Sequence, residues 1–234
     1  RNPALLKEVF LSMIGIDPAD DQSFELRSKE SKPSRKRIIL CVNRSLGEME
    51  LLQTKLRSFL AQLKLNGFEI IFIDLPEVSF DYKTISSTDI RADITKFLHR
   101  YGSDNEPRSF EGLVECYRER PHAHLYGMER LEDALAMPQI EKSELKKLVQ
   151  ENVVKARNLI NSILDRYDAD FVGFLNFVDW FSIGGGPSST LPVSFETKPP
   201  ISIMLGSRVG NDLALLDIVQ EFSEVAKAAQ HTDN

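Results

Sequence analysis

The sequence is poor in cysteine and tryptophan and contains no long apolar run. It has two cysteines, Cys41 and Cys116, and one tryptophan among 234 residues. So few cysteines exclude a disulfide framework and are typical of a reducing compartment, so we expect free thiols and a cytoplasmic location. No apolar stretch approaches the roughly 20 residues of a membrane-spanning helix, and no signal-peptide pattern is present. We therefore expect no association with a membrane.

Positive charge is also in deficit. The chain carries 29 Lys and Arg against 35 Asp and Glu, which gives a net charge of −6. Nucleic acids and anionic membranes attract proteins with an excess of Lys and Arg, so we expect neither as a partner. The 42% hydrophobic and 27% charged residues are typical of a globular chain with a substantial core. Because the chain starts at Arg1 and not at Met, we expect a processing site or the end of a fragment there.

Short apolar runs and amphipathic patterns predict alternating strands and helices at both ends of the chain. Residues 37–42 and 68–75 are apolar runs bounded by polar clusters, which is typical of buried strands. The helical pattern between them, over 47–65, indicates a βαβ unit, so the two strands should be parallel neighbours. Further strands are expected at 171–175, 191–195 and 201–206, followed by a helix at 212–228.

The middle of the chain shows no convincing strand pattern. Its longest helical pattern covers 142–167, with apolar residues on one face and charged residues on the other. Three shorter helices are expected at 86–101, 109–118 and 127–136. Together these patterns predict an α/β fold, a layered sandwich with a mixed sheet flanked by helices. We treat 1–234 as a single domain portion with a βα part (1–83), a helical middle (84–167) and C-terminal strands with a helix (168–234).

The glycine-rich segment 184–192 is the most unusual local sequence. Three consecutive glycines followed by hydroxyl residues are compatible with a phosphate cradle or an oxyanion-stabilising loop. A P-loop would need a Lys-Ser/Thr pair at the start of a helix, and a dinucleotide site would need a strand directly before the glycines and a helix directly after them. Neither is present, so we expect no cofactor. The favoured interpretation is a tight backbone passage into a strand, where no Cβ fits.

The loop after the strand predicted at 171–175 is the candidate ligand pocket. Loops at the carboxyl ends of strands line the ligand crevices of open α/β sheets. Asn176, Phe177, Asp179 and Trp180 combine aromatic surface with a few polar groups, as small-molecule pockets do. We predict that these four residues bind substrate. In the alternative interpretation, the aromatic rings pack between layers and Asp179 caps a turn.

Motifs for metal binding and for catalysis are weak or missing. His122 and His124 form a His-x-His pair that would reach one metal ion if the segment were extended. No motif supplies a third ligand, so we expect no metal and interpret both as loop histidines. The acidic turn at 17–21 lacks the oxygen spacing and the distal Glu of a calcium loop. No Gly-x-Ser-x-Gly elbow is present for a Ser/His/Asp triad, and we assign no catalytic residue.

Three segments, in order along the chain, resemble the amidase-signature family. Arg1, the short helix after it and Gly15–Asp20 are similar to the family's Arg, apolar-striped helix and Gly-x-Asp-Pro-x-Asp. Gly186–Val193 is similar to its Gly-x-Pro-Ser-x-Thr-x-Pro-Val strand start. Pro200–Arg208 and Asp212–Leu216 resemble its strand ending in Gly-x-Arg/Pro and its closing Asp-x-x-Leu-Leu helix. The order and spacing of these segments cover essentially the whole chain.

The resemblance implies the C-terminal part of an amidase-signature fold. Members of that family hydrolyse amide carbon–nitrogen bonds with a Ser–Ser–Lys triad, which lies upstream of the Arg that matches Arg1. The resemblance therefore places no catalytic residue on this chain, which alone should be inactive. It would supply scaffold and part of the pocket for a small amide substrate. The chain has Leu175-Asn176 where the family often has Pro-Thr, so its pocket should differ from the usual one.

Two other functions stay open on the residues alone. One is a catalytically inactive amidase-like module for binding or interaction, and the other is a small-ligand-binding α/β domain without amidase ancestry. If strands of the fold are missing from this chain, sheet edges and apolar helix faces should be exposed. We therefore expect pairing with a missing N-terminal half or self-association, and low stability of the isolated chain.

Overall fold

The computed structural model describes residues 3–18, 36–103, 106–120, 122, 127–138, 140–176, 178–194 and 200–232. The chain divides into two compact units. The first unit comprises Arg1–Glu77 and Val153–Asn234, and the second comprises Val78–Asn152. One long helix, α7 (Lys142–Arg166), begins in the second unit and ends in the first.

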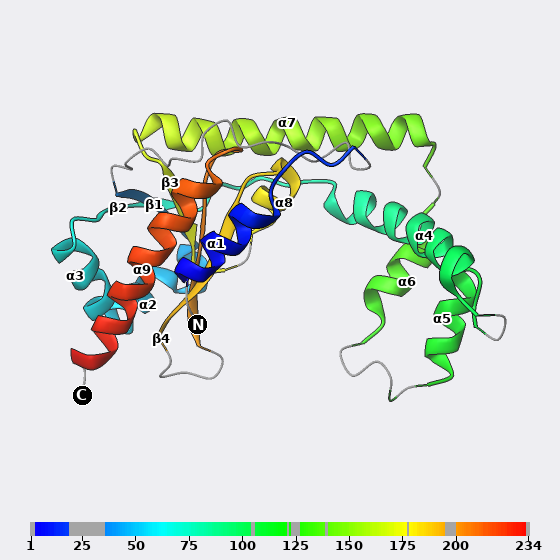
Figure 1. Ribbon diagram of the computed structural model, residues 1–234, viewed down its shortest axis with the longest axis horizontal. Coiled ribbons are helices and arrows are strands. Elements are labelled where there is room, and N and C mark those ends of the chain that lie inside the picture. Colours follow the sequence, from blue (N-terminus) through cyan, green and yellow to red (C-terminus); the bar gives the residue numbers. More distant parts are fainter. Residues whose placement is uncertain are drawn as a thin grey trace. The chain divides into compact units, whose positions relative to one another are not determined.

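A five-stranded mixed sheet forms the centre of the first unit (Figure 1). Its strand order is β2-β1-β3-β5-β4. β1 pairs in parallel with both β2 and β3, whereas β5 is antiparallel to both β3 and β4. The predicted βαβ unit with parallel neighbouring strands is therefore confirmed. The bounds of the strands are β1 (Arg37–Val42), β2 (Glu69–Asp74), β3 (Phe171–Phe174), β4 (Ser188–Ser194) and β5 (Ile201–Gly206).

The central strands are buried on both faces, which explains their continuous apolar runs. Every residue of β1 after Arg37 is buried, and so is every residue of β3. On one face the sheet packs against α3 (Arg57–Leu65) and α9 (Asp212–Thr232), where Phe222 stacks edge-on against Phe59 and Phe68 at 5.0 and 5.9 Å between ring centroids. On the other face the ring of Phe174 contacts the short helix α8 (Trp180–Gly184).

The prediction of one continuous helix over 47–65 is wrong. A 3-10 turn, η1 (Arg44–Leu46), precedes α2 (Glu48–Thr54), and a break at Lys55 and Leu56 separates α2 from α3. Leu56 has φ −112° and ψ 12°, which is not helical, and its side chain is buried. The break lets Leu56 enter the same core as the buried residues of both helices, so tertiary packing overrides the local helical preference.

The first helix of the chain, α1 (Pro3–Met13), lies beside α9 (Figure 1). Lys7 forms an ion pair with Asp217 of α9, 2.5 Å between Nζ and Oδ1. Several large apolar side chains of α1 nevertheless face solvent, and Met13 is 79% exposed. The others are Leu5, Leu6 and Val9. This exposed set, called the α1 apolar face below, is a feature of an incompletely covered helix.

Helices are the regular secondary structure among the described residues of the second unit, as predicted for the middle of the chain. Its helices are α4 (Tyr82–Tyr101), α5 (Phe110–Arg118), α6 (Glu129–Ala136) and the first part of α7. Phe110 and Val114 of α5 form a small core with Met128 and Ala134. Ser109 caps α5, because its hydroxyl accepts a hydrogen bond from the N–H of Gly112 at 3.1 Å.

Candidate functional site

Two loops meet at the carboxyl edge of the parallel strands. Asn43 follows β1 and Asn176 follows β3, and parallel neighbours end at the same edge of a sheet. Glu48, the first residue of α2, lies between them and is only 6% exposed. Its Oε2 accepts a hydrogen bond from the backbone N–H of Asn43 at 2.6 Å, and its Oε1 accepts one from the side-chain amide of Asn176. We call Asn43, Glu48 and Asn176 the Glu48 cluster.

The loop after β1 is built to present Glu48 inward. The side-chain oxygen of Asn43 accepts a hydrogen bond from the N–H of Ser45 at 3.1 Å, which starts the 3-10 turn η1. Gly47 then takes the left-handed conformation, with φ 69°, that glycine adopts without steric cost. This reversal starts α2 at Glu48. Arg44 forms an ion pair with Asp74, which ties the same loop to the end of β2.

The Glu48 carboxylate is buried without a cation. Among the residues that the structure describes, no Lys, Arg or His forms an ion pair with it, and both of its recorded donors are neutral N–H groups. Burial and the nearby negative charge of Glu48 raise the pKa of the Cys41 thiol to about 12. Cys41 is therefore protonated at neutral pH and is a poor nucleophile. The polar groups of the cluster can bind and orient a ligand, whereas they offer no nucleophile for a covalent step.

The four predicted substrate-binding residues have different surroundings. Asn176 is exposed and belongs to the Glu48 cluster. Asp179 is partly exposed and precedes α8 without making a side-chain capping bond. Trp180 is 4% exposed, and its ring stacks edge-on against Phe174 at 5.0 Å. Phe177 lies outside the described residues. A substrate-binding role for these residues stays a prediction.

Glu48 is the residue of this edge that the sequence analysis missed. Its place at the start of a helical pattern is typical of an ordinary acidic residue in a first turn, which favours the helix dipole. The signal that sets it apart is its bond to Asn176, 128 positions away in the sequence. Such a long-range contact leaves no trace in local periodicity.

The glycine-rich loop lies at the opposite end of the strands from the Glu48 cluster, where β3 and β4 begin and β5 ends. The prediction of a tight backbone passage into a strand is confirmed, because β4 begins at Ser188 directly after it. Gly185 has φ 68°, and a Cβ on Gly186 would come within 2.8 Å of the carbonyl oxygen of Ser207. The positive φ and the close approach of the backbone explain these two glycines.

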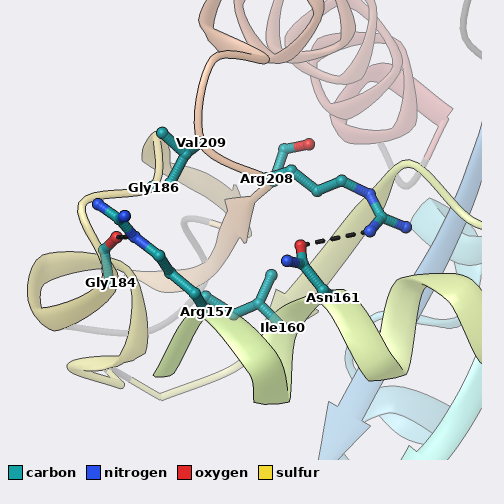
Figure 2. Close-up of a pocket in the computed structure, with 8 residues that line it drawn as sticks. Arg157, Ile160, Asn161, Gly184, Gly186, Arg208 and Val209 are labelled. Atoms are coloured by element: carbon teal, nitrogen blue, oxygen red, sulfur yellow. Dashed lines mark hydrogen bonds between the residues drawn. The ribbon is translucent and has the colours of Figure 1, made fainter. Parts of the chain in front are cut away.

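A cavity of about 230 Å³ lies next to this loop (Figure 2). Arg157 Nε donates a hydrogen bond to the carbonyl oxygen of Gly184 at 2.6 Å. Arg208 donates to Asn161 at 3.3 Å and to Asp165 at 2.7 Å. Figure 2 shows the guanidinium groups of Arg157 and Arg208 pointing away from each other, so they do not converge on one anion. The two arginines therefore add no support to the phosphate cradle that the glycines alone suggested.

No group of three or more His, Cys, Asp or Glu side chains gathers within metal-binding reach among the described residues. Of the predicted His-x-His pair, His122 is described and His124 is not. Both cysteines are free thiols. No helix in the described ranges has the length and apolar character that crossing a membrane requires.

No protein-family model and no curated protein sequence matches the chain. Solved structures do match. An amidase family protein from Bacillus anthracis str. Ames superposes with a TM-score of 0.74 and 16% identity, over 97% of this chain and 47% of that one. The peptide amidase from Stenotrophomonas maltophilia superposes with a TM-score of 0.72 and 14% identity, over 97% of this chain and 52% of that one. A bacterial aryl acylamidase of the amidase-signature enzymes superposes with a TM-score of 0.58 and 14% identity, over 94% of this chain and 50% of that one.

These matches define the class of fold. The mixed sheet flanked by helices is the α/β fold found in part of the amidase-signature enzymes, so the predicted fold class is confirmed. The chain spans about half the length of the solved structures that it matches. At this low identity, the likeness establishes a shared fold and leaves the activity to be argued from the site.

Proposed function

We propose that this chain is the C-terminal portion of an amidase-type hydrolase acting on amide carbon–nitrogen bonds, in which it supplies scaffold and part of the substrate pocket. The observation that carries the proposal is the coverage of the matches. Nearly the whole chain superposes on amidase-signature folds, yet it spans only about half of each. The family resemblance puts the Ser–Ser–Lys triad in the other half. The role left for this chain is to bind and orient.

The pocket wall in this proposal is the carboxyl edge that carries the Glu48 cluster. Asn176 is exposed there and is tied to a buried carboxylate, so its polar group is held in one orientation. The ring of Trp180 packs against Phe174, the last residue of β3, next to this loop in the sequence. A rigid, exposed polar group beside apolar side chains is what small-molecule pockets use to orient a ligand. A small amide is the substrate that we propose.

The partner in this proposal is the N-terminal half of the same enzyme, with self-association as the alternative. Two surfaces of the first unit support it. β4 is at one end of the described strand order, so one side of its backbone has no neighbour among the described strands. The α1 apolar face exposes large side chains such as Met13. We also propose a cytoplasmic location, which the small number of cysteines supports.

The test compares the 234-residue chain with the complete protein that contains it. Release of ammonia from primary amides, and of arylamine from anilides, is measured for both. The chain alone is expected to be inactive and the complete protein active. Amide hydrolysis by the chain alone, retained after exhaustive purification, would contradict the proposal. A complete protein that binds amides without hydrolysing them would favour the inactive binding module instead.

A further inference from the structure

A groove of about 470 Å³ lies between α2 and α3 in the first unit. We infer that this groove, called the α2–α3 groove below, binds a single-chain carboxylate of medium length through apolar contacts and two cationic side chains. The residues that line it are Leu52, Gln53, Arg57, Leu60, Ala61 and Lys64. None of them belongs to the Glu48 cluster, so the inference goes beyond the proposed function and does not depend on it.

The groove follows from the break between the two helices. α2 ends at Thr54 and α3 begins at Arg57, after the non-helical Leu56. Side chains three or four positions apart share one face of a helix, so Arg57, Leu60 or Ala61, and Lys64 follow one another along α3. Seven residues separate the two cations, which is about 10 Å along the helix axis. The apolar part of the groove therefore lies between two positive charges.

The two cations of the groove have no anionic partner in the part of the chain that the structure describes. Arg57 and Lys64 are exposed, and neither side chain has a hydrogen bond or an ion pair with another described residue. No Asp or Glu lines the groove, and the first turn of α3 contains no acidic residue to offset Arg57. The α1 apolar face differs, because its neighbour Lys7 is already paired with Asp217. The groove is thus a positive surface in a chain of net charge −6.

A carboxylate with an alkyl chain uses both features of the groove. Its head group accepts charge-assisted hydrogen bonds from a guanidinium or an ammonium group. Its chain contacts Leu60, Ala61 and the methylene stems of the two cations, which provide apolar surface of their own. The volume falls within the range of about 300–1,000 Å³ that is typical of small-molecule sites. Inorganic phosphate would leave the apolar surface unused, and a neutral chain would leave the cations unused.

The test titrates octanoate, 1-octanol and octyltrimethylammonium into the ¹⁵N-labelled 234-residue chain, followed by ¹⁵N–¹H spectra. Two exposed ion pairs should make octanoate bind roughly twofold to thirtyfold more tightly than 1-octanol, with octyltrimethylammonium the weakest. The shifted backbone signals should be those of α2 and α3, and hexanoate should bind less tightly than octanoate, by up to about fourfold per methylene. Octanoate binding no tighter than 1-octanol, or no binding of octanoate at all, would overturn the inference.

Charge variants test the role of the two cations. Arg57→Gln and Lys64→Gln, combined in one chain, should lower the affinity for octanoate to that for 1-octanol. Lys55→Gln is the matched control, because Lys55 is an exposed cation between the same helices that does not line the groove. A preference for octanoate that survives the double change, or that Lys55→Gln removes equally, would refute the inference. If the double variant does not fold, the three ligands on the unmodified chain still decide.

Two further variants test the position of the site. Ala61→Phe places a ring in the groove from an exposed helical position and should abolish the binding of octanoate. Val9→Gln changes the α1 apolar face, which is the rival apolar surface of the first unit, and should leave that binding unchanged. Octanoate binding that Val9→Gln removes and Ala61→Phe leaves intact would place the chain on α1 and overturn the inference. Hydrolysis by the complete protein tests the proposed function independently.

Discussion

The aromatic cluster around Phe222 allows a quantitative test of the fold. Phe222 is 1% exposed on α9 and packs edge-on against Phe59 of α3 and against Phe68, which precedes β2. The ring therefore joins the closing helix to the βαβ part of the sheet. Phe222→Ala removes a buried ring and leaves a cavity that these neighbours cannot fill without moving. Such changes lower the free energy of unfolding by about 3–5 kcal/mol.

The assay exploits the single tryptophan. Trp180 is buried in the first unit, so its fluorescence reports unfolding of that unit, whereas far-UV circular dichroism reports the helices of both units. For Phe222→Ala we expect the fluorescence midpoint in urea to fall by about 1–2 M. Phe222→Leu keeps most of the volume and should lose about 1 kcal/mol, which keeps the test informative if the alanine variant does not fold.

Leu65→Ala is the matched control. Leu65 ends α3 and is 78% exposed, so the change should stay within about 0.5 kcal/mol. A loss of less than about 1 kcal/mol for Phe222→Ala, or an equal loss for Leu65→Ala, would show that α9 does not pack on the sheet as described.

Four further predictions concern other parts of the first unit. Gly186→Ala should lower the free energy of unfolding, measured in urea, by about 1–3 kcal/mol, because its Cβ would meet the Ser207 carbonyl oxygen at 2.8 Å. Gly15→Ala is the control: a Cβ at Gly15 would have no atom within 4 Å, so the free energy of unfolding should change little. Cys41 should resist iodoacetamide at pH 8 in the folded chain while the partly exposed Cys116 reacts, and rapid labelling of Cys41 would contradict its burial. Folding raises the pKa of Cys41 from 9.0 to about 12. The protonated thiol therefore favours the folded state below pH 9, and this contribution to the free energy of unfolding is lost as the pH rises toward 12. Urea unfolding midpoints measured across that pH range test this expectation. Replacing Val9 and Met13 of the α1 apolar face by Gln should reduce concentration-dependent self-association in size-exclusion chromatography, and a parent chain that is monomeric at every concentration would refute that expectation.

The sequence was informative wherever burial alone determines a strand. Residues 37–42 form an unbroken apolar run because β1 is covered on both faces, and the predicted and observed bounds agree. β4 begins at Ser188, earlier than predicted, because its first residues are partly or fully exposed at the end of the sheet and need no apolar pattern. The sequence did not predict helix α8, because five residues are too few to show a helical periodicity. In the structure its first residue, Trp180, contacts Phe174.

The candidate site was predictable only in part, and for a related reason. The rule that ligands bind after the carboxyl ends of strands pointed to Asn176 from local sequence. Its partner Glu48 could not be found in that way, because strand pairing between β1 and β3 brings together residues 128 positions apart. The same pairing puts the loop after β1 into the site, although nothing in residues 43–48 resembles a binding motif.

The energetic cost of Glu48 favours the carboxyl edge over the glycine-rich loop as the functional one. Burying a carboxylate that no cation neutralises opposes folding, and two neutral N–H donors offset only part of that cost. An apolar residue of similar size would avoid that penalty, although it would leave the backbone N–H of Asn43 without its acceptor. The positive φ of Gly185 and the close backbone approach at Gly186, by contrast, follow from backbone geometry and need no ligand. In the proposed function, this cost is offset because Glu48 orients the exposed side chain of Asn176 toward a ligand.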